Sequence, residues 1–166
     1  MSGLKRLQVL VVDDNRHMRA ITSEILASAG FGMAHQAESG PEGLRRLAET
    51  PMDLVIVDYK MAPMDGIAFV RQLRARPSSR FVPVIMLTGH ANWRRVREAR
   101  DAGVTEFMVK PIAPRLLLER IESLIERPRP FVVAEGYTGP CRRRRADAAY
   151  AGERRRATDQ PVEIDA

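Results

Sequence analysis

Cysteine and long apolar runs are both scarce in this sequence of 166 residues. Cys141 is the only cysteine, so no disulfide bond can form within the chain. No apolar stretch approaches the roughly 18 residues of a membrane-spanning helix, which argues against membrane insertion. The apolar run after Lys5 and Arg6 ends at Asp13 and is too short for a secretory signal. We therefore expect a cytoplasmic protein whose single thiol stays reduced.

The positive charge of the chain is concentrated near its carboxyl end. The net charge is +6, and two arginine clusters at 142–145 and 154–156 stand out in the last part of the sequence. Such clusters either form a solvated tail or attract acidic partners, nucleic acid included. No helix-turn-helix pattern accompanies them, so we expect no specific DNA binding.

Strand and helix patterns alternate five times along most of the chain. The expected strands are 7–12, 31–37, 54–57, 82–87 and 104–109. The expected helices are 16–28, one capped by Ser39, 67–76, 91–101 and one that begins at Pro114. Ile21, Val96 and Ile125 fall on the helix faces that we expect to be buried. Five such βα units with apolar strands predict a parallel sheet covered by helices on both faces.

Polar and charged residues follow four of the expected strands. Because parallel strands with right-handed crossovers end at one edge, these residues should converge there. They are Asp13, Asp14, Asp58, Thr88 and Lys110.

Each of these residues has an ordinary structural explanation when it is taken alone. Asp14, Asn15 or Thr88 could cap a helix, and Lys110 could be a surface lysine. The group is harder to explain, since two carboxylates ~4 Å apart repel by about 4 kcal/mol at an effective dielectric of about 20. Three carboxylates at one edge therefore indicate a bound cation.

These residues, in this order, resemble the receiver domain of bacterial two-component response regulators. The resemblance covers roughly residues 5–127 and includes Gly89 after Thr88 and Pro111 after Lys110. It implies a flavodoxin-like, doubly wound five-stranded parallel sheet of strand order 2-1-3-4-5, with helices on both faces. Residues 1–127 would form the receiver domain, and 128–166 a Pro/Arg-rich extension without a core of its own.

The resemblance also implies a role for each residue of the site. Asp58 would accept a phosphoryl group, and Lys110 and Thr88 would contact the phosphoryl oxygens. Asp14 and Asp58 would bind Mg²⁺ directly, and Asp13 would bind it through a water. The backbone carbonyl of Lys60 would supply a further metal ligand. Carboxylate and carbonyl oxygens are the ligands that Mg²⁺ prefers.

Two features near Asp58 depart from the family pattern. A proline usually stands four residues after the acceptor, where this chain has Ala62 followed by Pro63. Lys60 and His90 occupy two variable positions beside the acceptor and are uncommon choices there. We hypothesise that these two cations alter the approach of hydrolytic water, and hence the lifetime of the phosphorylated form.

Further residues are candidates for switching and for partner binding. By the resemblance, Phe107 would turn inward when Thr88 moves toward the phosphoryl group; otherwise it is a core aromatic. Trp93, Arg94 and Arg97 would form a partner-binding face, unless Trp93 lies over a neighbouring helix. Acidic residues of the last helix would pair with arginines of 91–101 across a dimer, on the face of helix 4, strand 5 and helix 5. These are Glu119, Glu122 and Glu126.

The extension after residue 127 admits two interpretations. It is either a linker or a docking arm in which Phe131, Val133 and Tyr137 bind the domain or a partner.

The overall expectation is a single-domain response regulator in a phosphorelay. A histidine kinase or histidine phosphotransfer protein would supply the phosphoryl group, and the output would be binding to a downstream protein that the sequence does not identify. We do not expect an enzyme. Two alternatives remain open: a Mg²⁺-dependent phosphatase with an aspartate nucleophile, and nucleic-acid binding through the arginine clusters. The phosphatase requires a second acid two residues after the first, where this chain has Lys60 after Asp58 and Asn15 after Asp13.

Overall fold

The computed structural model describes residues 7–32, 34–90 and 92–141, together with the backbone of 160–162. Five strands and five helices alternate up to residue 126. The strands are β1 (Val9–Val12), β2 (His35–Ala37), β3 (Leu54–Asp58), β4 (Val84–Thr88) and β5 (Glu106–Val109). The helices are α1 (Arg16–Ser28), α2 (Gly40–Glu49), α3 (Gly66–Ala75), α4 (Trp93–Ala102) and α5 (Pro114–Glu126).

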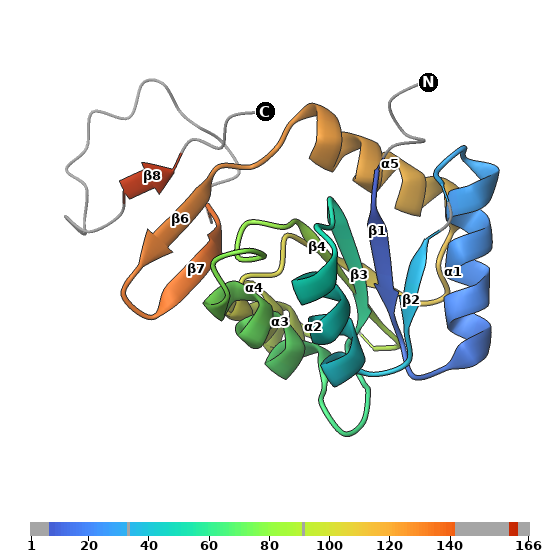
Figure 1. Ribbon diagram of the computed structural model, residues 1–166, viewed down its shortest axis with the longest axis horizontal. Helices are drawn as coiled ribbons and strands as arrows, with labels where there is room; N and C mark the ends of the chain where they lie inside the picture. Colours follow the sequence, from blue (N-terminus) through green and yellow to red (C-terminus); the bar gives the residue numbers. More distant parts are fainter. Residues whose placement is uncertain (1–6, 33, 91, 142–159, 163–166) are drawn as a thin grey trace.

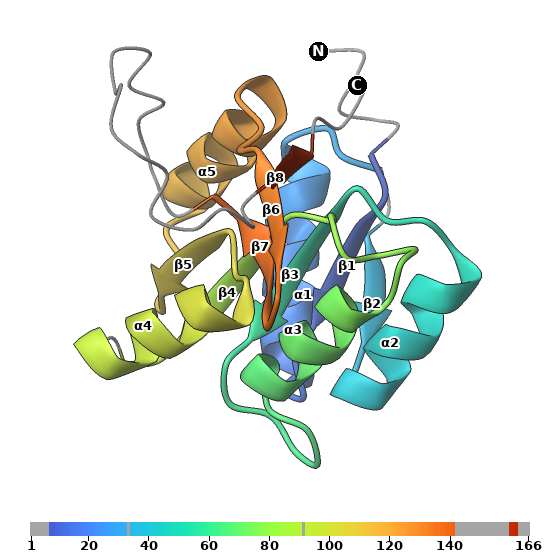
Figure 2. The ribbon, with the colours of Figure 1, turned by 90° about the vertical axis from the view of Figure 1, so that its left-hand side faces the viewer.

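The five strands form one parallel sheet in the order β2-β1-β3-β4-β5. Side chains of α2, α3 and α4 pack on one face of this sheet, and those of α1 and α5 pack on the other. Figures 1 and 2 show these two layers of helices around the central strands. The predicted flavodoxin-like fold and its strand order are confirmed. Among the described residues, no helix is both long and apolar enough to span a membrane.

Local sequence signals explain where most of the helices begin. The side chains of Asn15, Ser39, Asp65 and Asn92 each accept a hydrogen bond from a backbone N–H in the first turn of the following helix. Such caps satisfy amide groups that have no partner within the helix. Because Asn15 caps α1, the neighbouring Asp14 remains free for another role.

Strand β2 is shorter than the sequence predicted. The pattern predicted a strand over 31–37, but the strand comprises only His35–Ala37. The N–H of Phe31 donates to the carbonyl of Leu26, and Gly30 has a φ of 85°. Residues 30 and 31 therefore complete the carboxyl end of α1, and a positive φ of this kind favours glycine.

Three helix positions predicted to be buried are exposed. Ile21, Val96 and Ile125 are 47%, 42% and 44% exposed, respectively. Each helix buries a narrower stripe than its apolar pattern indicates. In α5 the stripe is Leu117, Ile121 and Leu124, and in α4 it consists of Ala99 and Ala102. Arg95 and Glu98, on either side of Val96 in the sequence, instead contact Tyr59 through polar groups.

The first part of the extension forms structure on the domain. Strands β6 (Phe131–Ala134) and β7 (Tyr137–Pro140) form an antiparallel pair, which we name the C-terminal hairpin. The backbone of β8 (Gln160–Val162) pairs with the other edge of β6. The C-terminal hairpin packs against α3 and α4, as Figure 1 shows in orange. The division of the chain at residue 127 remains a prediction, and the arginine clusters lie outside the described residues.

Candidate functional site

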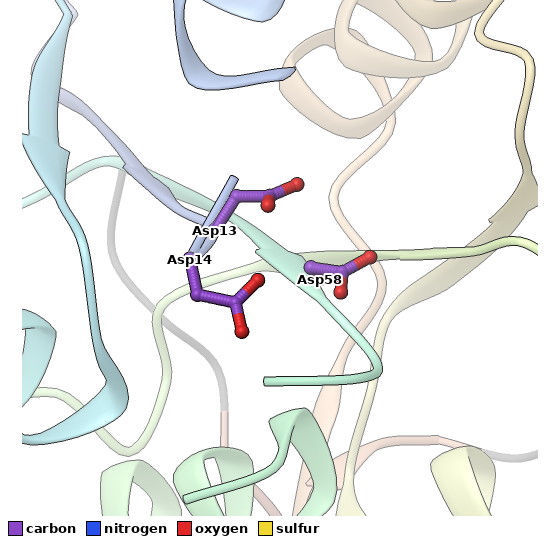
Figure 3. Close-up of side chains that lie close together, drawn as sticks. All are labelled: Asp13, Asp14 and Asp58. Atoms are coloured by element: carbon purple, nitrogen blue, oxygen red, sulfur yellow. The ribbon is translucent and has the colours of Figure 1, made fainter. Parts of the chain in front are cut away.

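Three carboxylates meet at the carboxyl-terminal edge of the sheet. Asp13 and Asp14 directly follow β1, and Asp58 is the last residue of β3, the strand beside it. Oxygen atoms of the three side chains lie within 4.8 Å of one another. Asp13 and Asp58 are 4% and 7% exposed, whereas Asp14 faces solvent. Figure 3 shows the three carboxylates close together at the ends of β1 and β3.

Lys110 joins this cluster from the end of β5. Its Nζ lies 2.9 Å from Oδ2 of Asp13 and 2.7 Å from Oδ1 of Asp58. Burial by itself would lower the pKa of Lys110, but hydrogen bonds to Asp58 and Asp13 outweigh it and raise that pKa. The lysine therefore stays charged and neutralises part of the acidic cluster.

The environment of Asp58 opposes its ionisation. Burial raises the pKa of the Asp58 carboxyl, and the charge of Asp13 adds to this rise. The hydrogen bond and charge of Lys110 lower the pKa, as does the backbone N–H of Lys60, but they do not cancel the effect of burial. A group with two positive charges in this space would favour the ionised form.

Backbone groups hold the acids in place. The N–H groups of Lys60 and Ala62 donate to Asp58 and Asp14, at 3.0 and 3.3 Å. The N–H of Asn15 donates to Asp13 at 2.8 Å. These contacts leave each carboxylate with lone pairs for a ligand.

Gly66 allows the loop after β3 to close. Its N–H donates to the carbonyl of Tyr59 at 2.9 Å. A Cβ at Gly66 would lie 2.3 Å from the carbonyl oxygen of Asp58, closer than any side chain tolerates. The glycine therefore brings α3 against the end of β3, and Ala62 at the departing position does not prevent this turn.

Thr88 is the last residue of β4, at the same edge of the sheet as Asp58. The side chain is 1% exposed, and its hydroxyl donates to the carbonyl of His90 at 3.1 Å. The hydroxyl thus lies at the predicted edge of the sheet, and its contact with a phosphoryl group remains a prediction.

The predicted switch and partner residues lie beyond β4. Phe107 of β5 is half-buried against the core on the α4 side. Trp93 is 68% exposed, and the guanidinium carbon of Arg94 is 5.7 Å from its ring centre. Arg97 is exposed and pairs with Asp101 at 3.8 Å. Their roles remain predictions.

Two features of the structure, one beside the site and one at the opposite edge of the sheet, were missed from the sequence. Tyr59, next to the predicted acceptor, donates its hydroxyl to Glu98 of α4 at 3.1 Å. Arg74 of α3 is 5% exposed and has no carboxylate partner in any described ion pair. Arg74 stands four residues after the buried Val70, so a helical wheel would have placed it on the buried face. No local signal indicated the contact of Tyr59.

The residues present fit an oxygen-ligated divalent cation. The chemistry of the set is three aspartate carboxylates, two of them buried, with a lysine that offsets only part of their charge. Small hard cations such as Mg²⁺ favour carboxylates combined with retained waters. Asp14, the exposed member, leaves an approach for such waters from solvent.

The architecture is that of a signalling receiver domain: a doubly wound parallel sheet with an acidic cluster and a lysine at its carboxyl edge. Sequence comparison agrees, because residues 9–122 match the family described as the response regulator receiver domain. The chain belongs to this family, which acts in two-component signalling.

The matches to individual relatives span nearly the whole length of each relative. The chain is 33% identical over 123 residues to chemotaxis protein CheY-3 of Vibrio cholerae, which covers 74% of this chain and 95% of that protein. It is 35% identical over 121 residues to chemotaxis protein CheY of Pseudomonas aeruginosa, covering 73% of this chain and 98% of the relative. Among solved structures, chemotaxis protein CheY4 of Vibrio cholerae superimposes with a TM-score of 0.67 at 32% identity, covering 70% of this chain and 96% of that one.

Proposed function

We propose that this chain is a single-domain response regulator that accepts a phosphoryl group on Asp58. The donor is a phosphohistidine of a histidine kinase or phosphotransfer protein, and the output is phosphorylation-dependent binding to a downstream protein. The observation that carries the proposal is the contact of Lys110 with both Asp13 and Asp58, at 2.9 and 2.7 Å, inside a cluster of three carboxylates. The lysine occupies the place where a phosphoryl oxygen beside Asp58 would need a positive charge.

The phosphoryl transfer requires no reactant besides the phosphohistidine and Asp58. An oxygen of the Asp58 carboxylate donates its electron pair to phosphorus, and the P–N bond of the phosphohistidine breaks. The electron pair of that bond remains on the imidazole nitrogen, so the donor leaves as histidine and the product is an acyl phosphate on Asp58. Charge neutralisation and alignment are the main requirements of such a transfer.

Different residues of the site would provide the charge neutralisation and the alignment. Asp13, Asp14, Asp58 and the carbonyl of Lys60 would hold Mg²⁺, which supplies charge neutralisation when it is bound. Lys110 keeps its charge and exchanges a carboxylate oxygen for a phosphoryl oxygen. Thr88 rotates its hydroxyl from the carbonyl of His90 toward the phosphoryl group.

The test is phosphorylation by a small donor. Wild type and Asp58→Asn are incubated with acetyl phosphate and Mg²⁺, and their intact masses are compared. We expect wild type alone to gain the mass of one phosphoryl group. Asp53→Asn is a matched control, because Asp53 lies just before β3, at the other end of the strand that carries Asp58, and accepts a backbone hydrogen bond from Gln8. Equal phosphorylation of wild type and Asp58→Asn would refute the proposal.

The proposal excludes steady phosphatase turnover. A phosphatase of the aspartate-nucleophile class uses a second acid two residues after the first, and here Lys60 directs its N–H to Asp58. Sustained hydrolysis of a generic phosphate ester, lost in Asp58→Asn, would favour the phosphatase instead.

The downstream partner is expected on the face that carries Trp93, Arg94 and Arg97. An exposed tryptophan next to arginines is a typical anchor for a protein interface. A pull-down with phosphorylated and unphosphorylated protein tests this. Trp93→Ala should lose the partners that only the phosphorylated form retains.

A further inference from the structure

The C-terminal hairpin lies at the edge of the sheet opposite to Asp58. Arg74 donates to the carbonyl of Val82, just before β4, and Arg129 donates to the carbonyl of Thr105, just before β5. Phe131 of the hairpin is 3% exposed, and the guanidinium carbon of Arg74 lies 5.0 Å from the centre of its ring. The hairpin thus covers a buried arginine of the domain.

The hairpin also contacts the carboxyl end of α4 through the backbone. Gly103 caps α4 with a φ of 93°, and its carbonyl accepts two hydrogen bonds from Arg74 at 3.0 and 2.8 Å. A Cβ at Gly103 would lie 2.5 Å from the carbonyl oxygen of Thr138, and a Cβ at Gly139 would lie 2.7 Å from Cα of Gly103. The two glycines therefore permit β7 and the end of α4 to touch directly.

Arg95 and Glu98, in the first two turns of α4, contact Tyr59, the residue after the predicted acceptor. Tyr59 donates to Glu98 at 3.1 Å, and the guanidinium carbon of Arg95 lies 5.0 Å from the centre of its ring. Arg95 also donates to the carbonyl of His90 at 3.2 Å. The same carbonyl accepts the hydroxyl of Thr88 at 3.1 Å.

Between these two attachments, α4 has little apolar packing. Its buried side chains are Ala99 and Ala102, while Trp93 and Val96 are exposed. An element with so few buried apolar contacts shifts at low cost in free energy. Its position is therefore sensitive to what happens at either end.

We propose that α4 couples the phosphorylation site to the C-terminal hairpin, so that phosphorylation of Asp58 loosens the hairpin from Gly103. This inference rests on the proposed function. A phosphoryl group that attracts the hydroxyl of Thr88 removes one of the two donors to the carbonyl of His90. Arg95 and the first half of α4 then adjust, and the rigid helix carries this movement to its contact with β7. By linkage, loosening the hairpin favours the phosphorylated arrangement to the same degree.

Cys141 provides a reporter for the hairpin. It is the only cysteine in the sequence and follows β7 directly. It is partly buried, and its N–H donates to the carbonyl of Pro130 at 2.7 Å. The rate at which a thiol reagent labels Cys141 therefore measures opening of the hairpin without any substitution in it.

The experiment measures this labelling rate with and without acetyl phosphate and Mg²⁺. In wild type we expect phosphorylation to accelerate labelling by at least about fivefold, the lower end of ordinary coupling between two sites. Asp58→Asn should show no acceleration. An unchanged labelling rate in wild type whose mass shows the phosphoryl group would overturn the coupling and leave the proposed function intact.

A second variant tests the coupling without phosphorylation. Glu98→Ala removes the acceptor of the Tyr59 hydroxyl and should accelerate labelling of Cys141 in the unphosphorylated protein. Glu119→Ala is the matched control, because Glu119 is an exposed helix acid of α5 that pairs with Arg115 instead. If wild type takes up no phosphoryl group, the proposed function fails. Equal labelling rates of Cys141 in unphosphorylated Glu98→Ala and wild type would overturn the coupling.

Discussion

Two cations, the half-buried Lys110 and the buried Arg74, lie at opposite edges of the sheet and have opposite surroundings. Lys110, at the carboxyl edge, contacts two carboxylates, and their hydrogen bonds raise its pKa against the effect of burial. Arg74, at the amino edge, has carbonyl oxygens and an aromatic ring around it. Burial lowers the pKa of Arg74 to about 9, and only Tyr137 acts in the other direction.

The difference indicates that the charge of Lys110 is available to a ligand, whereas the charge of Arg74 stabilises the fold. The carboxylates around Lys110 are strong acceptors. Phosphoryl oxygens can replace them, and the charged lysine would still have a hydrogen-bond acceptor. The carbonyls around Arg74 belong to the backbone of Gly103, at the end of α4, and of Arg80 and Val82, in the loop before β4, so the guanidinium joins these two segments to α3. Arginine suits the second task because its planar group offers several donors in fixed directions. Substitutions on the two sides should therefore affect different properties.

The largest expected effect on stability is that of Arg74→Ala. Loss of the guanidinium leaves the buried carbonyl of Gly103 and the partly buried carbonyls of Arg80 and Val82 without their donor, and it opens a cavity under Phe131. We expect the free energy of unfolding to fall by about 4 kcal/mol. Urea denaturation measures this. Arg71→Ala, an exposed arginine of the same helix, should change the stability by less than about 0.5 kcal/mol.

Phe131→Ala should have the next largest effect. The phenyl ring packs at 81° to Phe81, with ring centres 5.8 Å apart, besides covering Arg74. We expect a loss of about 3 kcal/mol in the same denaturation experiment. Glu135→Ala, exposed in the turn of the hairpin, is the control. A stability of Phe131→Ala equal to wild type would mean that the hairpin is no part of the domain core, and the comparison of the two edges would then break.

At the opposite edge, Asp58→Asn should stabilise the protein. The substitution removes a buried carboxylate whose pKa is raised by burial and by Asp13. In a chelator we expect a gain of about 1 kcal/mol, because one like-charge pair is relieved while Lys110 keeps Asp13 as a partner. Added Mg²⁺ should stabilise wild type more than Asp58→Asn and so reduce the difference. A destabilised Asp58→Asn in chelator would show that the carboxylate, like Arg74, serves the fold.

The smallest expected effect is on the lifetime of the acyl phosphate. Lys60 and His90 are exposed beside the site, and removing either side chain should change the hydrolysis half-life by about threefold, well under 1 kcal/mol of activation free energy. Loss of the phosphoryl mass over time in Lys60→Ala and His90→Ala measures it, with His35→Ala as the control. Half-lives identical to wild type would show that water approaches from elsewhere.

Much of the fold was predictable because its signals are local. Continuous apolar runs predicted four of the five strands closely, and the caps Ser39 and Asn15 lie where short polar side chains precede helical patterns. The second strand was predicted too long because Phe31, an apolar residue after a glycine, closes a helix by a backbone hydrogen bond that composition does not reveal.

The acidic site was predictable for a related reason. Parallel strands place their ends at one edge, so Asp13, Asp14 and Asp58 had to be near one another once the strands were assigned. The partner of Thr88 was not predictable, since a hydroxyl chooses among nearby acceptors by distances of less than 1 Å. The exposure of Val96 could not be predicted from the sequence either, because it depends on the distance between α4 and the sheet.

The order of residues along the chain determined the alternation of strands and helices, and with it the meeting of three carboxylates and a lysine at one edge. Only the tertiary structure decided that a buried arginine holds the opposite edge, that the first residues after α5 cover it, and that α4 buries only Ala99 and Ala102. The reason is physical: periodicity and capping act over a few residues, whereas the contacts of Arg74 and Gly103 join segments that are distant in sequence and meet only when the domain has packed.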